Sequence, residues 1–303
     1  MPVLAIAIAL TMTACVSPDA DPLERPVKSV LTPAEVRLEI HRRVPELPAE
    51  EVPVLFEVAP EVVARARGAF SQSEEPVERI RKVVRFIMAA DGLALEYDRG
   101  SLGVASETLE RGRGNCLSLA AVLVGVARGL GWQARFTEMS LRDDEIIYEA
   151  DIGILEEHMG ARLTTGPGTL YIDYSGRMSV RSRVRAVSDM RATAQYYNNH
   201  AYDLVHSSHV AGESVPWGEV ARRFEVATRV EPELSQAWNN LGVARSRLDD
   251  VEGAEAAYEH AIAAGDRTSS AERNLRLLHG LAPEDVEAGQ PGSAAGWAPL
   301  PGP

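Results

Sequence analysis

Cys116 is the residue of this sequence with the clearest potential for chemistry. It follows Gly114 and Asn115 and precedes an apolar run, residues 117–130, that predicts a largely buried helix beginning near the cysteine. Unpaired backbone N–H groups and the dipole at a helix N-terminus stabilise negative charge, so we expect a lowered thiol pKa and a nucleophilic thiolate. The backbone N–H of Cys116 could also donate to a tetrahedral oxyanion. A packing role for the cysteine is the alternative.

The segment around the cysteine resembles the nucleophile segment of the transglutaminase-like superfamily, which is related to the papain-like enzymes. Residues 113–120 read RGNCLSLA. That family places a histidine on a strand after the cysteine and an aspartate on the next strand. His158 follows Cys116 by 42 residues and Asp173 follows His158 by 15, both in strand-like stretches. The resemblance implies a triad in which His158 is the general base and acid and Asp173 orients its ring.

Two positions depart from the usual pattern of the family. Many members have aspartate where this chain has Asn115 and an aromatic residue where it has Met159, although Asn-Cys-Leu-Ser-Leu occurs in relatives joined to tetratricopeptide (TPR) repeats. A second oxyanion donor usually comes from an upstream side chain, and Tyr97 is the candidate. A core aromatic residue is the alternative for Tyr97.

The chemistry implied by the resemblance is thioester acyl transfer on protein or peptide amide bonds. Water as acceptor makes the protein a cysteine peptidase or amidase, and an amine makes it a cross-linking acyltransferase; the sequence does not decide between them. A non-catalytic scaffold that keeps the papain-like groove to bind peptides is the alternative. Redox sensing by Cys116 is a weaker one, because no resolving cysteine lies nearby.

Helical signals precede the cysteine and strand signals follow it. Residues 32–35, Thr-Pro-Ala-Glu, form a capping box with proline at the first helical position, which predicts a helix to about Arg43. Further helices are predicted over residues 60–69 and 75–88. The predicted strands are residues 133–139, 145–154, 158–163 and 169–174. This order indicates an α+β fold, and the resemblance implies helices packed on an antiparallel sheet.

The second half of the chain carries a repeat with a period of 34 residues, which aligns Phe224 with Tyr258 and Ala227 with Ala261. Residues 235–266 resemble a TPR. The matching residues are Trp238, Leu241, Gly242, Ala254, Tyr258 and Ala261. The resemblance implies an all-α module of helical hairpins that recruits a protein partner, and an unrelated helical bundle is the alternative.

The N-terminus reads as an export signal. Residues 3–10, VLAIAIAL, are too few to span a bilayer, which takes about 20 apolar residues. The following Met-Thr-Ala and Cys15 resemble a bacterial lipoprotein signal, which implies lipid on Cys15 and a membrane anchor on the periplasmic face. Val16 stands where an aspartate retains some lipoproteins at the inner membrane, so we expect the outer membrane. An ordinary cleaved signal or a hydrophobic N-terminus with an incidental cysteine is the alternative.

Composition excludes several classes of protein. Among 303 residues, 44 acidic and 31 basic side chains give a net charge of −13, which disfavours nucleic acid as a partner. Two cysteines are too few for a disulfide framework or a four-cysteine zinc site, and no loop of closely spaced acids suits calcium, so we expect no metal or cofactor. The predicted divisions are a signal peptide at 1–15, a tether at 16–30, a transglutaminase-like domain at 31–188, TPR-like helices at 189–282 and a disordered tail at 283–303.

Overall fold

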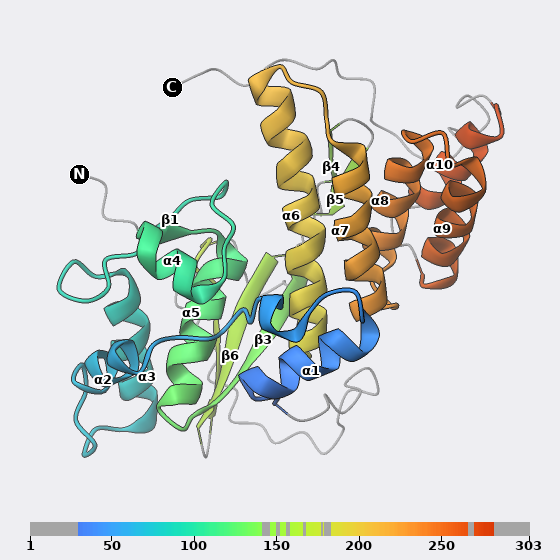
Figure 1. Ribbon diagram of the computed structural model, residues 1–303. Coiled ribbons are helices and arrows are strands. Elements are labelled where there is room, and N and C mark those ends of the chain that lie inside the picture. Colours follow the sequence, from blue (N-terminus) through green and yellow to red (C-terminus); the bar gives the residue numbers. More distant parts are fainter. Residues whose placement is uncertain are drawn as a thin grey trace.

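The computed structural model describes residues 30–140, 146–149, 152–155, 158–165, 168–176, 178, 183–265 and 270–281. They form a body of helices around an antiparallel sheet, continued by a row of helices (Figure 1). The predicted signal peptide with Cys15, the predicted tail and all of the predicted tether except Val30 lie outside the described residues. Within the described part of the chain, no helix is both long enough and apolar enough to cross a membrane.

The helices before the cysteine confirm three predictions and add two elements. They are α1 (Pro33–Arg43), the 3₁₀ helix η1 (Ala49–Glu51), α2 (Pro60–Arg67), α3 (Pro76–Met88) and α4 (Ala105–Arg111). The capping box is present, because the Thr32 hydroxyl accepts a bond from the backbone of Glu35 and the Glu35 carboxylate accepts one from the backbone of Thr32. The 3₁₀ helix η1 and the short helix α4 are the two elements that were not predicted.

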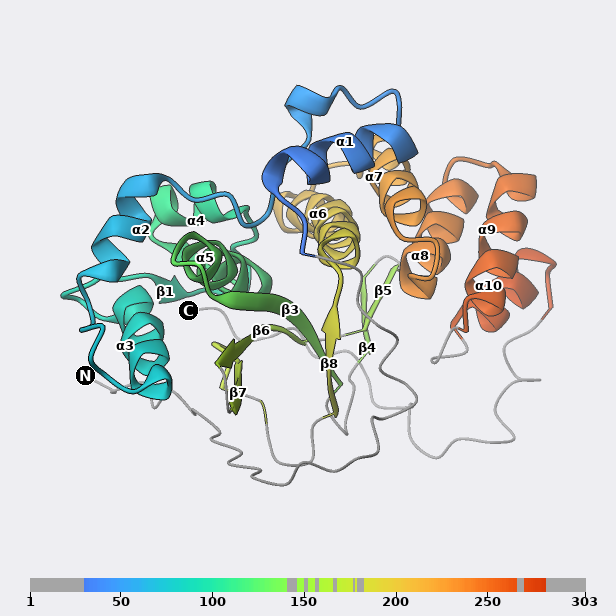
Figure 2. The same ribbon diagram turned by 90° about the horizontal axis from the view of Figure 1, so that it is seen from below.

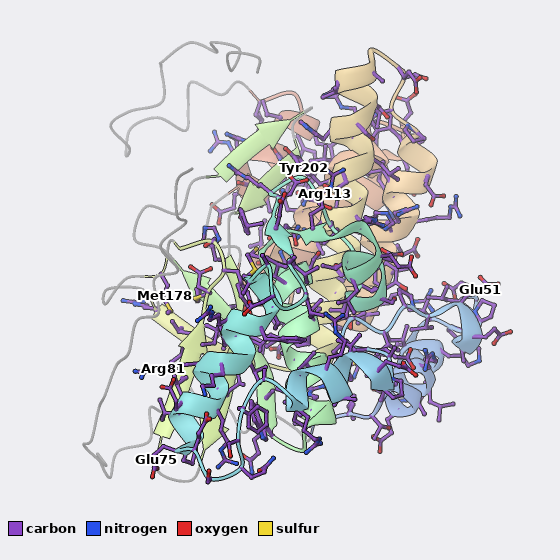
Figure 3. All side chains as sticks on the ribbon, turned by 90° about the vertical axis from the view of Figure 1, so that its left-hand side faces the viewer. Glu51, Glu75, Arg81, Arg113, Met178 and Tyr202 are labelled. Atoms are coloured by element: carbon purple, nitrogen blue, oxygen red, sulfur yellow. The ribbon has the colours of Figure 1, made fainter. Side chains whose placement is uncertain are left out.

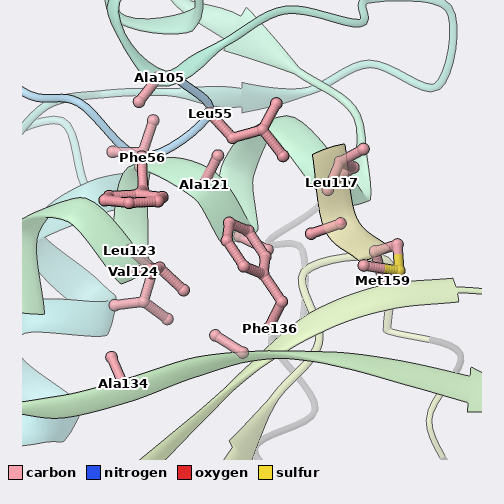
Figure 4. Packing of buried hydrophobic residues seen from close by; sticks show 14 of the residues in the cluster. Leu55, Phe56, Ala105, Leu117, Ala121, Leu123, Val124, Ala134, Phe136 and Met159 are labelled. Carbon is pink, nitrogen blue, oxygen red and sulfur yellow. The ribbon is translucent and has the colours of Figure 1, made fainter. Parts of the chain in front are cut away.

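Helix α5 (Cys116–Gly129) runs through the centre of this body, and every residue from 117 to 127 in it is buried. It packs on strands β3 and β6 and on helices α2 and α4. In Figure 4 the Phe136 ring extends from β3 towards α5, near Ala121 and Leu117. The apolar sequence of α5 therefore reflects packing contacts on all of its sides. Its first residue, Cys116, lies at one end of the sheet.

The sheet against which α5 packs has the strand order β7-β6-β3-β8 and is antiparallel throughout. Its strands are β3 (Gln133–Ser140), β6 (His158–Thr165), β7 (Gly168–Ile172) and β8 (Arg183–Val187). The strands β3, β6 and β7 confirm three of the four predicted strands, and β8 was not predicted. A separate parallel pair joins β1 (Glu96–Tyr97) to β2 (Arg113–Gly114).

The prediction of one strand over residues 145–154 is wrong. The chain forms two strands there, β4 (Ile146–Glu149) and β5 (Ile152–Leu155), which pair antiparallel in a sheet of their own. Glu149 pairs with Ile152, so the chain reverses between these two residues, and the sequence there has none of the Asn-Gly or Asp-Gly pairs that mark a tight hairpin. The hairpin packs against a helix of the second half of the chain, α8 (Ser235–Ser246).

The second half of the described chain is helical. Its helices are α6 (Asp189–Ala211), α7 (Trp217–Val230), α8, α9 (Val251–Ala263) and α10 (Ser270–Leu278), and each packs against the next. Helix α6 belongs to two hydrophobic cores. Its first half joins the core around α5 through Met190, Ala192, Ala194, Tyr196 and Tyr197, whereas Ala201 and Val205 join the core of the helical row. The predicted division at residues 188 and 189 stays a prediction.

Candidate active site

The nucleophile segment is held by backbone pairing between β2 and β1. Strand β2 ends at Gly114, and its parallel partner β1 places Tyr97 directly opposite Gly114, two residues before Cys116. Tyr97 is half-buried and packs at the edge of the main core, as Cys116 does. The structure therefore brings Tyr97 beside the chain that leads into the cysteine, and its role as an oxyanion donor stays a prediction.

Asn115 is the N-cap of α5. Its Oδ1 accepts a hydrogen bond from the backbone N–H of Ser118 at 3.0 Å and another from the Ser118 hydroxyl at 3.0 Å. The backbone N–H of Asn115 donates to the carbonyl of Ser101 at 2.8 Å, and the buried Ser118 hydroxyl accepts from the N–H of Gly103 at 2.9 Å. An N-cap needs a side-chain oxygen, which asparagine supplies as well as the aspartate of many family members.

Two glycines permit the close approaches that build the site. A Cβ at Gly114 would lie 2.7 Å from the Cβ of Ser118 and 2.8 Å from the Cγ2 of Thr108. A Cβ at Gly160 would lie 2.4 Å from the carbonyl oxygen of Ile172 on the neighbouring strand. Neither position 114 nor position 160 therefore has room for a side chain larger than that of glycine.

His158 and Asp173 come from neighbouring strands at one end of the sheet. His158 is the first residue of β6 and lies opposite Met139 of β3. Asp173 directly follows β7, and because β7 runs antiparallel to β6 with Ile172 opposite Ala161, Asp173 lies towards the start of β6. Both side chains are buried, at 5% and 2% exposure.

The Asp173 carboxylate is fixed by the loop that follows it. Oδ1 accepts hydrogen bonds from the backbone N–H of Ser175 at 2.8 Å and from its hydroxyl at 2.6 Å. Oδ2 accepts from the backbone N–H of Met178 at 2.8 Å (Met178 is labelled in Figure 3). We had not predicted Ser175 and Met178 as positioning residues. The signal for Ser175 was available, because an aspartate followed two residues later by serine is typical of an Asx turn.

The Cys116 thiol lies where these elements meet. Cys116 as a whole is partly accessible, but burial of its thiol raises the pKa. The Asp173 carboxylate raises it further, whereas the backbone N–H groups of Met159, Leu117 and Cys116 lower it by a smaller amount. The prediction of a lowered thiol pKa is therefore wrong for this structure, because desolvation outweighs the helix N-terminus.

The arrangement gathers a thiol, an imidazole and a carboxylate at one end of the sheet. The thiol interacts with the backbone N–H of Met159, the residue after His158, and with the charge of Asp173. The buried Met159 side chain belongs to the main core, so the position beside His158 serves packing here. Among the described residues, no group of three or more histidine, cysteine, aspartate or glutamate side chains is placed to hold a metal ion.

The six residues that resemble a TPR come together where α8 packs on α9. Leu241, Ala254, Tyr258 and Ala261 are buried, and a Cβ at Gly242 would lie 2.5 Å from the Tyr258 ring. Trp238 stacks on His260 with the ring centroids 4.4 Å apart and donates its indole N–H to the carbonyl of Pro232 at 3.0 Å. This is close packing of a helical hairpin, and its assignment as a TPR stays a prediction.

Comparison with known proteins bears on the part of the chain that runs from α2 to past the middle of α6. A search of curated proteins found no match. The family model described as the transglutaminase-like superfamily matches residues 62–202. This range runs from α2 into α6 and contains Tyr97, Cys116, His158 and Asp173. Over residues 62–202 the chain is therefore a transglutaminase-like domain.

Proposed function

We propose that Cys116, His158 and Asp173 form a catalytic triad for thioester acyl transfer on protein or peptide amide bonds. One observation carries the proposal: the thiol at the start of α5 interacts both with the backbone N–H beside His158 and with the buried carboxylate of Asp173. The start of α5, the start of β6 and the residue after β7 would thus supply the three groups that acyl transfer requires.

The reaction has two halves, and His158 carries a proton in both. His158 takes the thiol proton while the sulfur attacks the amide carbonyl carbon, and the resulting oxyanion accepts a hydrogen bond from the backbone N–H of Cys116. The C–N bond then breaks, the leaving amine takes the proton from His158, and the acyl group remains on sulfur as a thioester. Water or an amine, deprotonated by His158, attacks the thioester, and Cys116 regains its proton. Asp173 orients the ring throughout.

The raised pKa of the Cys116 thiol decides how the first step begins. Burial favours the neutral thiol, so Cys116 has to give up its proton as the reaction begins. Transfer of the proton to His158 then accompanies the attack on the substrate, and binding of the substrate has to bring the carbonyl to a protonated sulfur. The rate of the reaction is thus expected to depend strongly on His158, which acts as the general base.

A second candidate function is favoured by the same observation. A buried cysteine whose thiol pKa is raised is a poor nucleophile, and such a site suits a non-catalytic scaffold that binds peptides in the papain-like groove. In this case His158 would have little influence on the reactivity of the thiol.

The proposal also places the protein in the cell. The lipoprotein-like sequence at residues 12–15 supports a lipid on Cys15 and attachment to the periplasmic face of a bacterial membrane, with the outer membrane preferred. The TPR-like helices α6–α10 support recruitment of a protein partner to the membrane-anchored domain. Replacement of Cys15 by alanine should release the protein from the membrane fraction, and a chain that stays with the membranes would contradict the anchor.

The experiment that tests the triad is alkylation of Cys116 by iodoacetamide across pH, on a soluble chain that begins near Leu23 and has Cys116 as its only cysteine. We expect His158→Ala to slow alkylation near pH 7 by about tenfold or more, since a general base contributes about 10²–10⁴. His279→Ala, on the far end of the helical row, is the matched control and should alkylate like the parent. Equal rates for parent and His158→Ala would favour the scaffold.

The products of the reaction then distinguish hydrolysis from transamidation. The parent would be incubated with an unstructured protein, with and without methylamine, and the products analysed by mass spectrometry. Carboxylate ends indicate a peptidase or amidase, whereas methylamides indicate transfer to an amine. Cys116→Ser should give neither product.

A further inference from the structure

Ser118 is the one polar residue in the buried stretch of α5. The other residues from 117 to 127 are apolar or glycine, and all of them are buried, with Ser118 at 0% exposure. Ser118 lies two residues after Cys116, in the first turn of the helix (the course of α5 can be followed in Figure 2). A hydroxyl group that is removed from water destabilises the fold unless hydrogen bonds replace its contacts with water, so a serine at this position depends on its partners.

The Ser118 hydroxyl joins the cap of α5 to the loop that enters α4. Its oxygen accepts a hydrogen bond from the backbone N–H of Gly103 at 2.9 Å. Its proton lies within reach of two acceptors, Asn115 Oδ1 at 3.0 Å and the carbonyl oxygen of Ser101 at 3.4 Å. The same carbonyl oxygen accepts from the backbone N–H of Asn115 at 2.8 Å. One hydroxyl group thus ties the cap residue to the loop before α4.

The loop before α4 is itself held at both ends. The backbone N–H of Asp98 donates to the carbonyl oxygen of Gly114 at 3.0 Å, and the carbonyl oxygen of Leu102 accepts from Nη1 of Arg111 at 2.7 Å. Gly114 also leaves the space that Ser118 fills, because a Cβ at position 114 would lie 2.7 Å from the Cβ of Ser118. The hydroxyl therefore bonds to partners whose own positions are fixed by hydrogen bonds.

These bonds determine which N–H groups of the first turn remain for the sulfur. Asn115 Oδ1 accepts from the backbone N–H of Ser118 at 3.0 Å, which leaves the N–H groups of Cys116 and Leu117 outside the cap. Both N–H groups act on the Cys116 thiol and lower its pKa, although burial raises the pKa by more. Their direction follows from the position of the cap, which the Ser118 hydroxyl helps to fix.

We infer that Ser118 is a positioning residue for Cys116, because its hydroxyl holds Asn115 and the loop before α4 so that first-turn N–H groups are directed at the reacting sulfur. The inference rests on the proposed role of Cys116 as the nucleophile and assigns a further residue to the preparation of its thiol. Ser118 acts through the backbone of the first turn and not by contact with a substrate. Loss of the hydroxyl should therefore leave Cys116 in place but make its thiolate harder to form.

Alkylation of Cys116 by iodoacetamide across pH tests this inference on the soluble chain. Ser118→Ala removes the hydroxyl group, whereas Ser118→Thr keeps it and adds a methyl group to a packed position, so both variants should unfold at lower urea concentrations than the parent. Only Ser118→Ala should shift the midpoint of the pH profile, upward by about half a pH unit or more, which slows alkylation about threefold below the midpoint.

Thr193→Val is the matched control for the loss of a buried hydroxyl. The Thr193 hydroxyl donates to the carbonyl oxygen of Asp189 within its own helix at 2.8 Å, so its loss should leave the pH profile parental. A parental profile in Ser118→Ala, or equal shifts in Ser118→Ala and Ser118→Thr, would overturn the inference, since the hydroxyl would then contribute only to the stability of α5.

Two further variants keep the outcome clear. If Ser118→Ala does not fold, Asn115→Ala takes its place, because it removes the same hydrogen bond from the other end and should shift the midpoint in the same direction. His158→Ala tests the general base separately. A profile that responds to the loss of the Ser118 hydroxyl and not to His158→Ala would support the positioning role and contradict the triad.

Discussion

The ion pair of Arg128 and Asp189 joins the cysteine helix to the helical row, and its removal gives the prediction with the largest effect. Arg128 lies near the end of α5 and Asp189 is the first residue of α6, with side chains only 13% and 4% exposed. The pairing is bidentate, with Nη2–Oδ1 at 2.8 Å and Nη1–Oδ2 at 3.2 Å. The guanidinium also lies 4.3 Å from the centroid of the Phe56 ring and donates through Nε to the carbonyl of Ala134 at 3.1 Å.

Breaking one side of this pair leaves a buried charge without its partner. Asp189→Asn keeps an acceptor for the backbone N–H of Leu31, which now donates to Oδ2 at 3.1 Å, so the change isolates the charge. We expect Asp189→Asn and Arg128→Met each to lower the free energy of unfolding by about 3 kcal/mol, the low end of the range for a broken buried pair. At about 2–4 °C per kcal/mol, the melting temperature should fall by about 10 °C.

Urea denaturation of the parent, both single variants and the double variant measures the coupling. Arg128→Met/Asp189→Asn buries no charge, so it should cost no more than either single change. Glu78→Gln is the control, because the Arg81–Glu78 pair at 3.3 Å is exposed and should contribute less than about 1 kcal/mol. Single variants that cost less than about 1 kcal/mol, or costs that simply add in the double variant, would refute the argument.

Three smaller predictions concern the site itself. Because burial raises the pKa of Cys116 in the folded chain, the unfolded thiol loses its proton first, above about pH 8.5, and stability should fall there by up to about 1.4 kcal/mol per pH unit. Urea denaturation of the parent and Cys116→Ser at pH 7.5 and 9.5 checks this, and parallel pH dependence would contradict it. Gly160→Ala should cost about 1–3 kcal/mol in thermal or urea unfolding, since its Cβ would meet the carbonyl of Ile172 at 2.4 Å; a neutral result would mean that the two strands separate easily. Asn115→Ala should cost about 1 kcal/mol through loss of the N-cap, whereas Asn115→Asp should unfold at the parental urea concentration, and equal losses in both would argue against capping as the role of Asn115.

Elements with strong local signals could be predicted from the sequence. The capping box at Thr32 and Glu35 defines the start of α1, and the apolar run after Cys116 defines α5, because both signals lie within a few residues of the element. Helix α4 was missed because seven residues are too few to show a helical period. Strand β8 was missed because it depends on distant partners, among them the buried Glu138, whose carboxylate pairs with Arg185 and Arg191.

The candidate residues could be named from the sequence, and their role as a triad stays a prediction, whereas the electrostatics around them could not be inferred. Resemblance supplied Cys116, His158 and Asp173, and the structure places all three at one end of the sheet. The direction of the thiol pKa could not be inferred in the same way. A helix N-terminus is visible in the local sequence, whereas burial of the thiol depends on where the chain of residues 158–174 returns to α5.

Two physical routes connect the helical row to the site, and they differ in what they control. The Arg128–Asp189 pair joins two helix termini through charges that are fixed in the core, so its loss should lower stability with little effect on the reactivity of Cys116. The hairpin joins α8 to the start of β6 through a short element that is marginal by itself, so its release should alter the surroundings of His158 with little loss of stability. The Arg128–Asp189 pair allows a direct test: Asp189→Asn should lower the free energy of unfolding while Cys116 is alkylated at the parental rate, and slower alkylation would contradict a purely structural role for the pair.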